Sequence, residues 1–264
     1  RPQWMRKYEY SLQEITRRER KCIRLLRINP GHNSIFKDMR EALLYKKVER
    51  RVTHCYLCAH HCRIAEGKFG FCGVRQNIEG TLYTHVYAKP IAMQIDPIEK
   101  KPLYHFLPGS LSFSVATMGC NFSCGFCQNW EISQSKIEKD ALQFPEPEVF
   151  PEEIVAGALK NNCKSISYTY TEPTIFFEYA LDISRLAKEK NLYNIFVSNG
   201  YMTKDCLEAI NGNLNAANVD LKFFKDSSYR KVCGGSLEPV LNSIVNMKEM
   251  GVWVEITTLV VPGE

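Results

Sequence analysis

SFSVATMGCNFSCGFC, residues 112–127, joins an expected β-strand to three closely spaced cysteines. The apolar run at 112–117 is typical of a short buried strand. Directly after it, Cys120, Cys124 and Cys127 follow a C-x3-C-x2-C spacing on a loop that contains a glycine. A loop of this kind can direct three thiolates toward one small object, so the stretch predicts a metal centre at the end of a strand.

Three thiolates favour an iron–sulfur cluster over a single ion. Thiolates select iron–sulfur clusters, zinc or copper(I). A structural zinc site needs a fourth ligand, and the nearest histidine in the sequence is His105. The spacing also lacks the closely following fourth cysteine of bacterial ferredoxins. A 4Fe–4S cluster with three protein ligands would keep one iron open for chemistry.

Downstream of the cysteines, strand and helix signals alternate, which is typical of a parallel sheet or barrel. Pro residues with acids in the first turn, or Ser/Thr caps, mark the helix starts. The expected strands are 112–117, 165–170, 194–198, 217–221 and 252–260, and the expected helices start near Pro151, Pro173, Thr203 and Ser236. The last strand would leave an open edge, so we expect that the chain is truncated at its C-terminus or that another segment supplies an edge strand.

These motifs resemble the radical S-adenosylmethionine (SAM) superfamily, in which C-x3-C-x2-C follows the first strand and an aromatic residue, here Phe126, precedes the last cysteine. MGCNFSCGFCQNWEIS at 118–133 is similar to the pyruvate formate-lyase activating-enzyme-like branch. DPIEKKPLYHFLPGS at 96–110, and the C-x2-C-x3-C spacing with EGKFGFCGVR at 55–75, resemble the AmmeMemoRadiSam system radical SAM enzyme. The resemblance implies an α/β fold, a partial (β/α)6 radical SAM barrel over 111–264.

The resemblance also implies an activity. A 4Fe–4S cluster on Cys120, Cys124 and Cys127 would bind SAM and cleave it reductively to methionine and a 5′-deoxyadenosyl radical. The radical would abstract hydrogen from a substrate that the sequence does not name, a macromolecule or partner protein being one candidate. An electron donor such as ferredoxin or flavodoxin is implied as a partner, and the hard chemistry belongs to the cofactor.

Candidate SAM contacts follow the strands, where ligands bind in barrels. They are Phe126, Tyr170, Thr171, Glu172, Ser198, Asn199, Asp220 and Lys222. The superfamily has Gly-Gly-Glu-Pro where this chain has residues 170–173, so two glycines are replaced. The alternatives are structural: a helix start capped by Thr171, a plain Asn-Gly turn at Asn199, and mutual pairing of Asp220 and Lys222.

A second set of cysteines precedes the barrel. Cys55, Cys58, Cys62 and Cys72 fall within 18 residues among glycines that permit tight turns. Four thiolates could bind structural Zn²⁺, one iron or a second iron–sulfur cluster. Zinc would stabilise the fold of a segment that is too small to have its own hydrophobic core. A second iron–sulfur cluster would instead relay electrons. Disulfides and ligation by His54, His60 or His61 are the less favoured interpretations.

The composition of the chain limits the class of protein that it can be. The chain has 264 residues with 45% hydrophobic and 24% charged, which excludes wholesale disorder. No apolar run reaches the roughly 18 residues of a membrane span, and no secretory signal is visible. Eleven cysteines without such a signal favour metal ligation in the cytoplasm over disulfides.

Three regions are expected. They are a basic helical arm at 1–50, a Cys/His/Gly-rich metal-binding module at 51–110, and the partial barrel at 111–264. Residues 1–51 hold nearly half of the 34 Lys and Arg, and a solvated helical face explains this better than contact with nucleic acid. The rival to the enzyme is a binding module with zinc at both cysteine sites and an arm that contacts nucleic acid or protein. A third hypothesis is methyl transfer from SAM by the same cluster.

Overall fold

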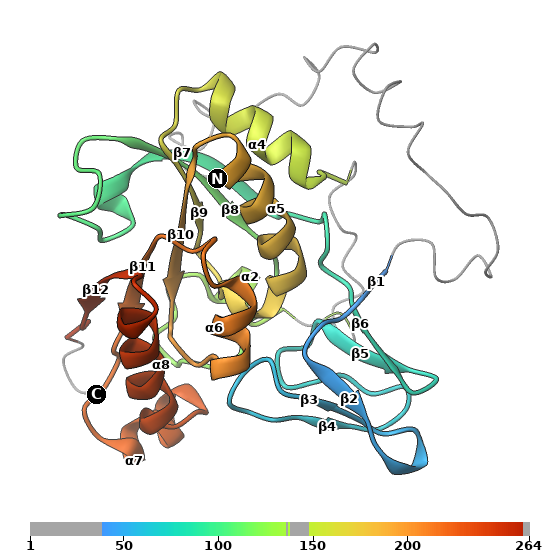
Figure 1. The fold of residues 1–264 in the computed structure, drawn as a ribbon. Coiled ribbons are helices and arrows are strands. Elements are labelled where there is room, and N and C mark those ends of the chain that lie inside the picture. The colour runs from blue at the N-terminus through green and yellow to red at the C-terminus, as the bar shows by residue number, and fades with distance from the viewer. Residues whose placement is uncertain (1–38, 136, 138–147, 261–264) are drawn as a thin grey trace, which may run out of the picture. The chain divides into compact units, whose positions relative to one another are not determined.

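A six-stranded sheet in the order β12-β11-β10-β9-β8-β7 organises the protein (Figure 1). The structure is a computed structural model that describes residues 39–135, 137 and 148–260. Five parallel strands make up most of the sheet: β8 (Leu111–Ala116), β9 (Ser165–Tyr168), β10 (Tyr193–Ser198), β11 (Ala216–Asp220) and β12 (Trp253–Thr257). Each begins within one residue of its expected start, so the predicted parallel sheet is confirmed.

Helices connect these strands as expected. They are α4 (Pro151–Lys160), the 3-10 turn η7 (Pro173–Phe176) continued by α5 (Phe177–Glu189), α6 (Lys204–Ile210) and α8 (Leu237–Glu249). Thr203 caps α6, because its Oγ1 accepts a hydrogen bond from Cys206 N at 3.2 Å. Ser236 holds the N-cap position of α8 but makes no capping bond, since its hydroxyl pairs with Tyr201 Oη at 3.1 Å.

Three short elements complete the barrel part. They are α2 (Trp130–Ser133), α7 (Asp226–Ser228) and the π-helical turn η8 (Tyr229–Cys233). The outer layer packs tightly against the sheet: a Cβ added to Gly157 of α4 would stand 3.1 Å from the Phe113 ring. A helix that approaches a strand this closely needs a residue without a side chain at the contact.

Before the barrel, the chain forms two three-stranded antiparallel sheets, β1-β6-β5 and β2-β3-β4. Their strands are β1 (Arg40–Glu41), β2 (Tyr45–Lys47), β3 (Thr53–Cys55), β4 (Arg63–Ile64), β5 (Arg75–Ile78) and β6 (Thr81–Thr84), with the turn η5 (Glu49–Arg51). The expected helical arm is therefore wrong for residues 40–47. Such short strands depend on distant partners, as when Arg40 pairs with Thr84, and local sequence does not reveal them. Residues 1–38 of the arm lie outside the described residues.

Strand β7 (Ala92–Pro97) joins the main sheet antiparallel to β8, although its residues were expected in the metal-binding module. The turn η6 (Ile98–Lys100) and the residues after it then fold onto the sheet. Ile98 and Leu103 pack in one buried cluster with Ile195 of β10 and Ala216 of β11. The segment that follows β7 therefore packs against strands β10 and β11 of the main sheet.

A buried ion pair ties the antiparallel part to the barrel. Arg75 of β5 and Glu178 of α5 are 2% and 3% exposed, and Arg75 Nη2 lies 2.5 and 2.7 Å from the two carboxylate oxygens. The same carboxylate accepts a hydrogen bond from Leu43 N at 2.6 Å. A bidentate pair inside protein is strong only while both members remain.

We expect Arg75→Met to lower the free energy of unfolding by about 3–5 kcal/mol, because the Glu178 carboxylate would stay buried without its partner. Urea denaturation of the full chain, followed by circular dichroism, measures the change. The double variant Arg75→Met/Glu178→Leu should recover most of the loss, since no lone charge remains. Lys204→Gln is the control, because its ion pair with Glu208 is exposed. An unchanged urea midpoint in Arg75→Met would contradict this account.

Candidate functional site

The loop of residues 117–129, here called the cluster loop, follows β8 and carries Cys120, Cys124 and Cys127, all partly exposed. Gly119 allows its path: φ is +93°, and a Cβ there would stand 2.7 Å from Val74 Cγ1. Further along, Ser123 N donates to the Cys233 carbonyl oxygen at 2.8 Å. The loop is thus held on both sides, and its three thiols sit at the carboxyl end of a parallel strand.

Hydrogen-bond donors lie next to the sulfurs of this loop, although burial and the Glu172 carboxylate raise the pKa of Cys120. Phe122 N donates to Cys120 Sγ at 3.3 Å, and the Ser133 hydroxyl lies 3.2 Å from Cys127 Sγ. A hydrogen bond with the Cys233 thiol lowers the pKa of Cys124, and the nearby Lys222 ammonium lowers it further. Hydrogen-bond donors and cations favour the charged form of a thiol.

Within the described ranges, no three His, Cys, Asp or Glu side chains are arranged to hold a single metal ion. A four-iron cluster is wider than one ion, so its ligands need not converge on one point. The cluster loop has room beside Gly125, where an added Cβ would meet no atom within 4 Å. Three partly exposed thiols on one loop suit a cluster with three protein ligands.

Glu172 joins the loops that follow β9 and β10. Its fully buried carboxylate accepts hydrogen bonds from Thr174 N at 3.1 Å, Thr174 Oγ1 at 2.6 Å, Ser198 Oγ at 2.8 Å and Asn199 N at 2.8 Å. Burial raises the pKa of this carboxyl, and the four donors oppose that shift. The structure therefore brings Glu172, Ser198 and Asn199 together, with the glutamate side chain already satisfied by protein groups.

Thr171 does not cap the following helix, although the structural alternative expected that it would. Thr171 Oγ1 donates to the Thr117 carbonyl oxygen at 2.7 Å, which ties the turn to the start of the cluster loop. The capping residue is Glu172, whose side chain accepts from Thr174 N. The helix-start interpretation is thus correct for the segment but assigns the cap to the wrong residue.

Tyr170 occupies a strained position next to this turn. Its φ is +65°, a conformation that glycine adopts without cost. Its hydroxyl donates to the Asp96 carboxylate, the Lys101 ammonium lies 4.4 Å from its ring centroid, and Asn129 Nδ2 donates to its carbonyl oxygen at 2.7 Å. These contacts hold the tyrosine in place of a glycine, and its side chain points to the Asp96–Lys101 pair.

Asp96 and Lys101 form a buried ion pair next to Tyr170. The sequence analysis did not predict this pair. Asp96 Oδ2 accepts from Lys101 Nζ at 2.6 Å and from Ser114 Oγ at 2.8 Å. Burial lowers the pKa of Lys101 to about 8, while the hydrogen bond to Asp96 opposes the shift. Both residues belong to the DPIEKKPLYHFLPGS segment, whose resemblance was the available signal, although no spacing in it indicates a buried pair.

The remaining predicted SAM contacts lie around the cluster loop. Lys222 Nζ and Asp220 Oδ2 are 2.9 Å apart, so the pairing alternative is present in the structure. Lys222 also lies close enough to Cys124 to lower the pKa of that thiol. Phe126 packs edge-on against the Phe223 ring, with centroids 5.9 Å apart.

The four upstream cysteines gather in one place. The pKa values of Cys58, Cys62 and Cys72 are raised, first by burial and also by the neighbouring thiols of this set. Arg75 Nη1 donates to Cys55 Sγ at 3.7 Å. All ten cysteines in the described residues are free, so the structure contains no disulfide among these four.

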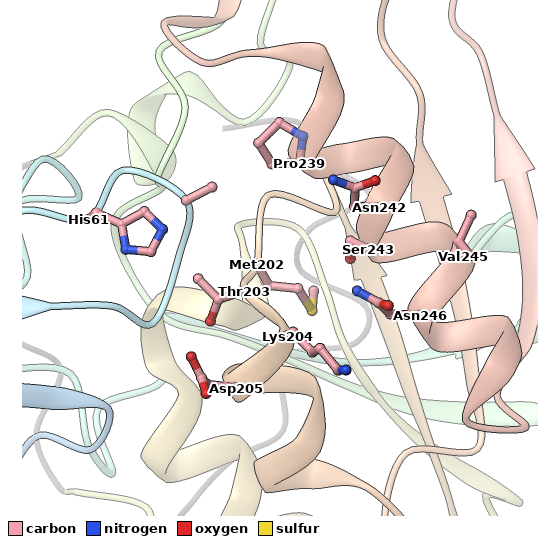
Figure 2. A pocket seen from close by; sticks show the side chains of 11 residues that line it. His61, Met202, Thr203, Lys204, Asp205, Pro239, Asn242, Ser243, Val245 and Asn246 are labelled. Atoms are coloured by element: carbon pink, nitrogen blue, oxygen red, sulfur yellow. The ribbon is translucent and has the colours of Figure 1, made fainter.

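A pocket of about 490 Å³ lies between residues 59–61, the start of α6 and α8 (Figure 2). His61, Lys204 and Asn246 are among the side chains around it. None of the cysteines proposed as ligands and none of the predicted SAM contacts lines this pocket, although His61, a less favoured metal ligand, does.

Comparison with known proteins identifies the class. The radical SAM superfamily profile matches residues 114–264, from the second half of β8 through β12, so the chain belongs to this superfamily. The superfamily implies a 4Fe–4S cluster and SAM.

Relatives are known from Methanocaldococcus jannaschii. The chain is 46% identical over 225 residues to the uncharacterized protein MJ0808, covering 85% of this chain and 66% of that protein. It is 25% identical over 159 residues to the putative glycyl-radical enzyme activating enzyme MJ1632, covering 57% of this chain and 56% of that protein. The chain thus spans less than two thirds of these curated relatives.

Among solved structures, TYW1 with a lysine-pyruvate adduct bound is similar with a TM-score of 0.40 and 22% identity, covering 58% of this chain and 56% of that chain. Streptococcus suis SuiB is similar with a TM-score of 0.43 and 15% identity, covering 56% of this chain and 32% of that chain. Separately, no helix in the described part of the chain has the length and apolarity to cross a membrane.

We expect Gly119→Ala to distort the cluster loop. Its Cβ would stand 2.7 Å from Val74 Cγ1 and 3.0 Å from the Cys72 carbonyl oxygen, at a φ of +93°. Overpacking of this kind costs about 1–3 kcal/mol of unfolding free energy. Iron retained after anaerobic reconstitution should fall as well, and both quantities are measured on the full chain. Adding Val74→Ala should relieve the overlap only in part, because the backbone strain remains. Unchanged stability and iron content would refute this account.

Proposed function

We propose that this chain is a radical SAM enzyme in which Cys120, Cys124 and Cys127 hold a 4Fe–4S cluster. The observation that carries the proposal is three thiols on one loop at the end of β8, inside the segment that matches the superfamily. When bound, the cluster supplies the electron for reductive cleavage of SAM, whose 5′-deoxyadenosyl radical abstracts hydrogen from the substrate.

The residues of this chain have the task of holding SAM beside the thiols. The backbone of residues 170–172 and the turn at Ser198 and Asn199 are joined through Glu172, so the ends of β9 and β10 present one fixed surface. Lys222 carries a largely buried positive charge next to Cys124, where it suits the carboxylate of SAM. The Phe126 and Phe223 rings supply apolar cover that excludes water.

We assign the chain further to the pyruvate formate-lyase activating-enzyme-like branch, and within it to the AmmeMemoRadiSam system enzymes. Similarity to a putative glycyl-radical enzyme activating enzyme supports the branch. The segments that resemble the AmmeMemoRadiSam enzyme both reach the site: residues 96–101 underlie Tyr170, and Val74 contacts Gly119. A cytoplasmic location, a ferredoxin or flavodoxin as electron donor, and a macromolecular substrate or partner protein belong to this proposal.

We expect Cys120→Ala, Cys124→Ala and Cys127→Ala each to abolish formation of 5′-deoxyadenosine, because two thiolates cannot hold the cluster. The wild-type chain, reconstituted without oxygen, should bind about four irons with as many sulfides at this site. With dithionite and SAM it should release 5′-deoxyadenosine, quantified by liquid chromatography. Cys163→Ala is the matched control, since Cys163 is buried away from the cluster loop and should leave the activity intact.

Other results would decide between the alternatives. Zinc at the site of Cys120 and no SAM cleavage would support the non-enzymatic binding module instead. Transfer of a labelled methyl group from SAM to a product would support the methyl-transfer hypothesis.

We propose that Cys55, Cys58, Cys62 and Cys72 form a second metal site, holding zinc, iron or an iron–sulfur cluster. The support is four thiols close enough to affect one another's pKa, with the Arg75 guanidinium directed at Cys55 Sγ to offset thiolate charge. These thiols are not arranged around a common point, so binding has to draw them together.

We expect Cys58→Ser to lower the metal content of the second site and to leave the four irons at Cys120, Cys124 and Cys127 in place, because the two sets of ligands are separate. Elemental analysis of zinc and iron in this variant and in Cys120→Ala measures each site in turn. Equal metal content in wild type and Cys58→Ser would remove the second site from the proposal.

A further inference from the structure

His60 stands between Cys58 and Cys62 but contacts the cluster loop. Its Nε2 donates a hydrogen bond to the Asn121 carbonyl oxygen at 2.6 Å. Asn121 lies directly after Cys120 and is fully buried. A residue of the upstream cysteine segment thus holds the backbone between the first two cysteines of the cluster loop.

The imidazole of His60 is itself fixed by two rings. It stacks on Phe71 with centroids 4.1 Å apart, and the Tyr201 ring meets it edge-on at 5.0 Å. The backbone next to it is also tied to the barrel, because Ala59 N donates to the Tyr201 carbonyl oxygen at 3.3 Å. A donor held in this way can define the position of its acceptor.

The side chain of Asn121 connects this hydrogen-bonded backbone to Asn199. Its Oδ1 accepts a hydrogen bond from Asn199 Nδ2 at 2.7 Å. Asn199 N in turn donates to Glu172 Oε2 at 2.8 Å. The carboxamide of Asn121 therefore links the cluster loop to the turn that we assign to SAM.

We propose that His60 is a positioning residue for SAM, acting through Asn121 on Asn199; the inference rests on the proposed function. Without the imidazole donor, the buried Asn121 carbonyl would lack its bond and the loop would shift to recover one. The Asn121 carboxamide and Asn199 would move with it. Loss of one hydrogen bond displaces the loop less than the steric overlap at Gly119 would, so the three cysteines still hold the cluster and the defect falls on SAM affinity.

The test uses the full chain with its cluster reconstituted without oxygen and reduced with dithionite. The electron paramagnetic resonance spectrum is recorded as SAM is added, and iron is measured in parallel. His60→Phe keeps a ring but loses the donor, and we expect the SAM concentration at half the spectral change to rise three- to tenfold, the loss of roughly one hydrogen bond. Iron content should equal that of the wild type.

Two variants separate the donor from general packing. His60→Gln places an amide donor near the position of Nε2, so its SAM affinity should return to within about twofold of wild type. His85→Phe is the matched control, because His85 Nε2 bonds to Gln76 Oε1 at 2.9 Å and not to the cluster loop. Its SAM titration should match the wild type.

A second disruption keeps the inference testable if His60→Phe does not fold. Asn121→Ala retains the carbonyl that His60 binds and removes the link to Asn199, so SAM affinity should fall as in His60→Phe. Wild-type SAM affinity in either His60→Phe or Asn121→Ala overturns the positioning role, and so does failure of His60→Gln to restore it. A wild-type spectrum that never responds to SAM overturns the proposed function itself, and with it this inference.

Discussion

The approach of the cluster loop to the Cys-rich segment is the constraint on which the site depends. At Gly119 the loop comes so close to Val74 and to the Cys72 carbonyl that no side chain fits. On its other side the loop is bonded to the backbone of η8 through Ser123. Because the loop is fixed between the Cys-rich segment and η8, its thiols have one arrangement before any cofactor binds. This lowers the conformational entropy that is lost on binding.

Buried polar groups fix the surfaces around this loop, and each has partners both nearby and in distant parts of the chain. Glu172 accepts four hydrogen bonds, and Asp96 accepts from Lys101, Ser114 and Tyr170. In a low-dielectric interior such groups are costly unless fully paired, so each one selects a single arrangement of the loops it joins. Strain at Tyr170 is tolerated because this pairing surrounds it.

The sequence was sufficient to predict the strands and helices whose signals, apolar periodicity and helix caps, are local. The strands from β8 to β12 and the helices that start at Pro151, Pro173 and Lys204 follow from alternating apolar runs and helix-start residues. Strands β1 to β7 were not found. Strands β5 and β6 form a local hairpin, in which Ile78 pairs with Thr81, that the sequence analysis missed, whereas the pairing of β1 with β6 joins residues far apart, such as Arg40 and Thr84. Short strands of this kind depend on tertiary contacts rather than on propensity.

The residues of the candidate site also fall into those that the sequence could predict and those that it could not. The spacing of Cys120, Cys124 and Cys127 could be recognised because all three ligands lie on one loop. His60, Asn121 and the Asp96–Lys101 pair could not, because their importance arises only when β7, the cysteine-rich turns and the barrel loops meet. Asp220 and Lys222 show why spacing alone was ambiguous: one strand face permits both a mutual ion pair and a ligand contact, and the structure contains the pair beside Cys124.

The segment before the barrel therefore has a physical role whatever its cysteines bind. Its glycine- and aromatic-rich turns form one wall of the cluster loop, through Val74 at Gly119 and His60 at Asn121. The buried Arg75–Glu178 pair fastens this wall to α5, because a charge on either side would be uncompensated if the two parts separated. A metal at the upstream thiols would act on the same wall, since Arg75 reaches Cys55 as well as Glu178. The upstream thiols thus belong to the segment that packs against the cluster loop, although they are not among the ligands proposed for its cluster.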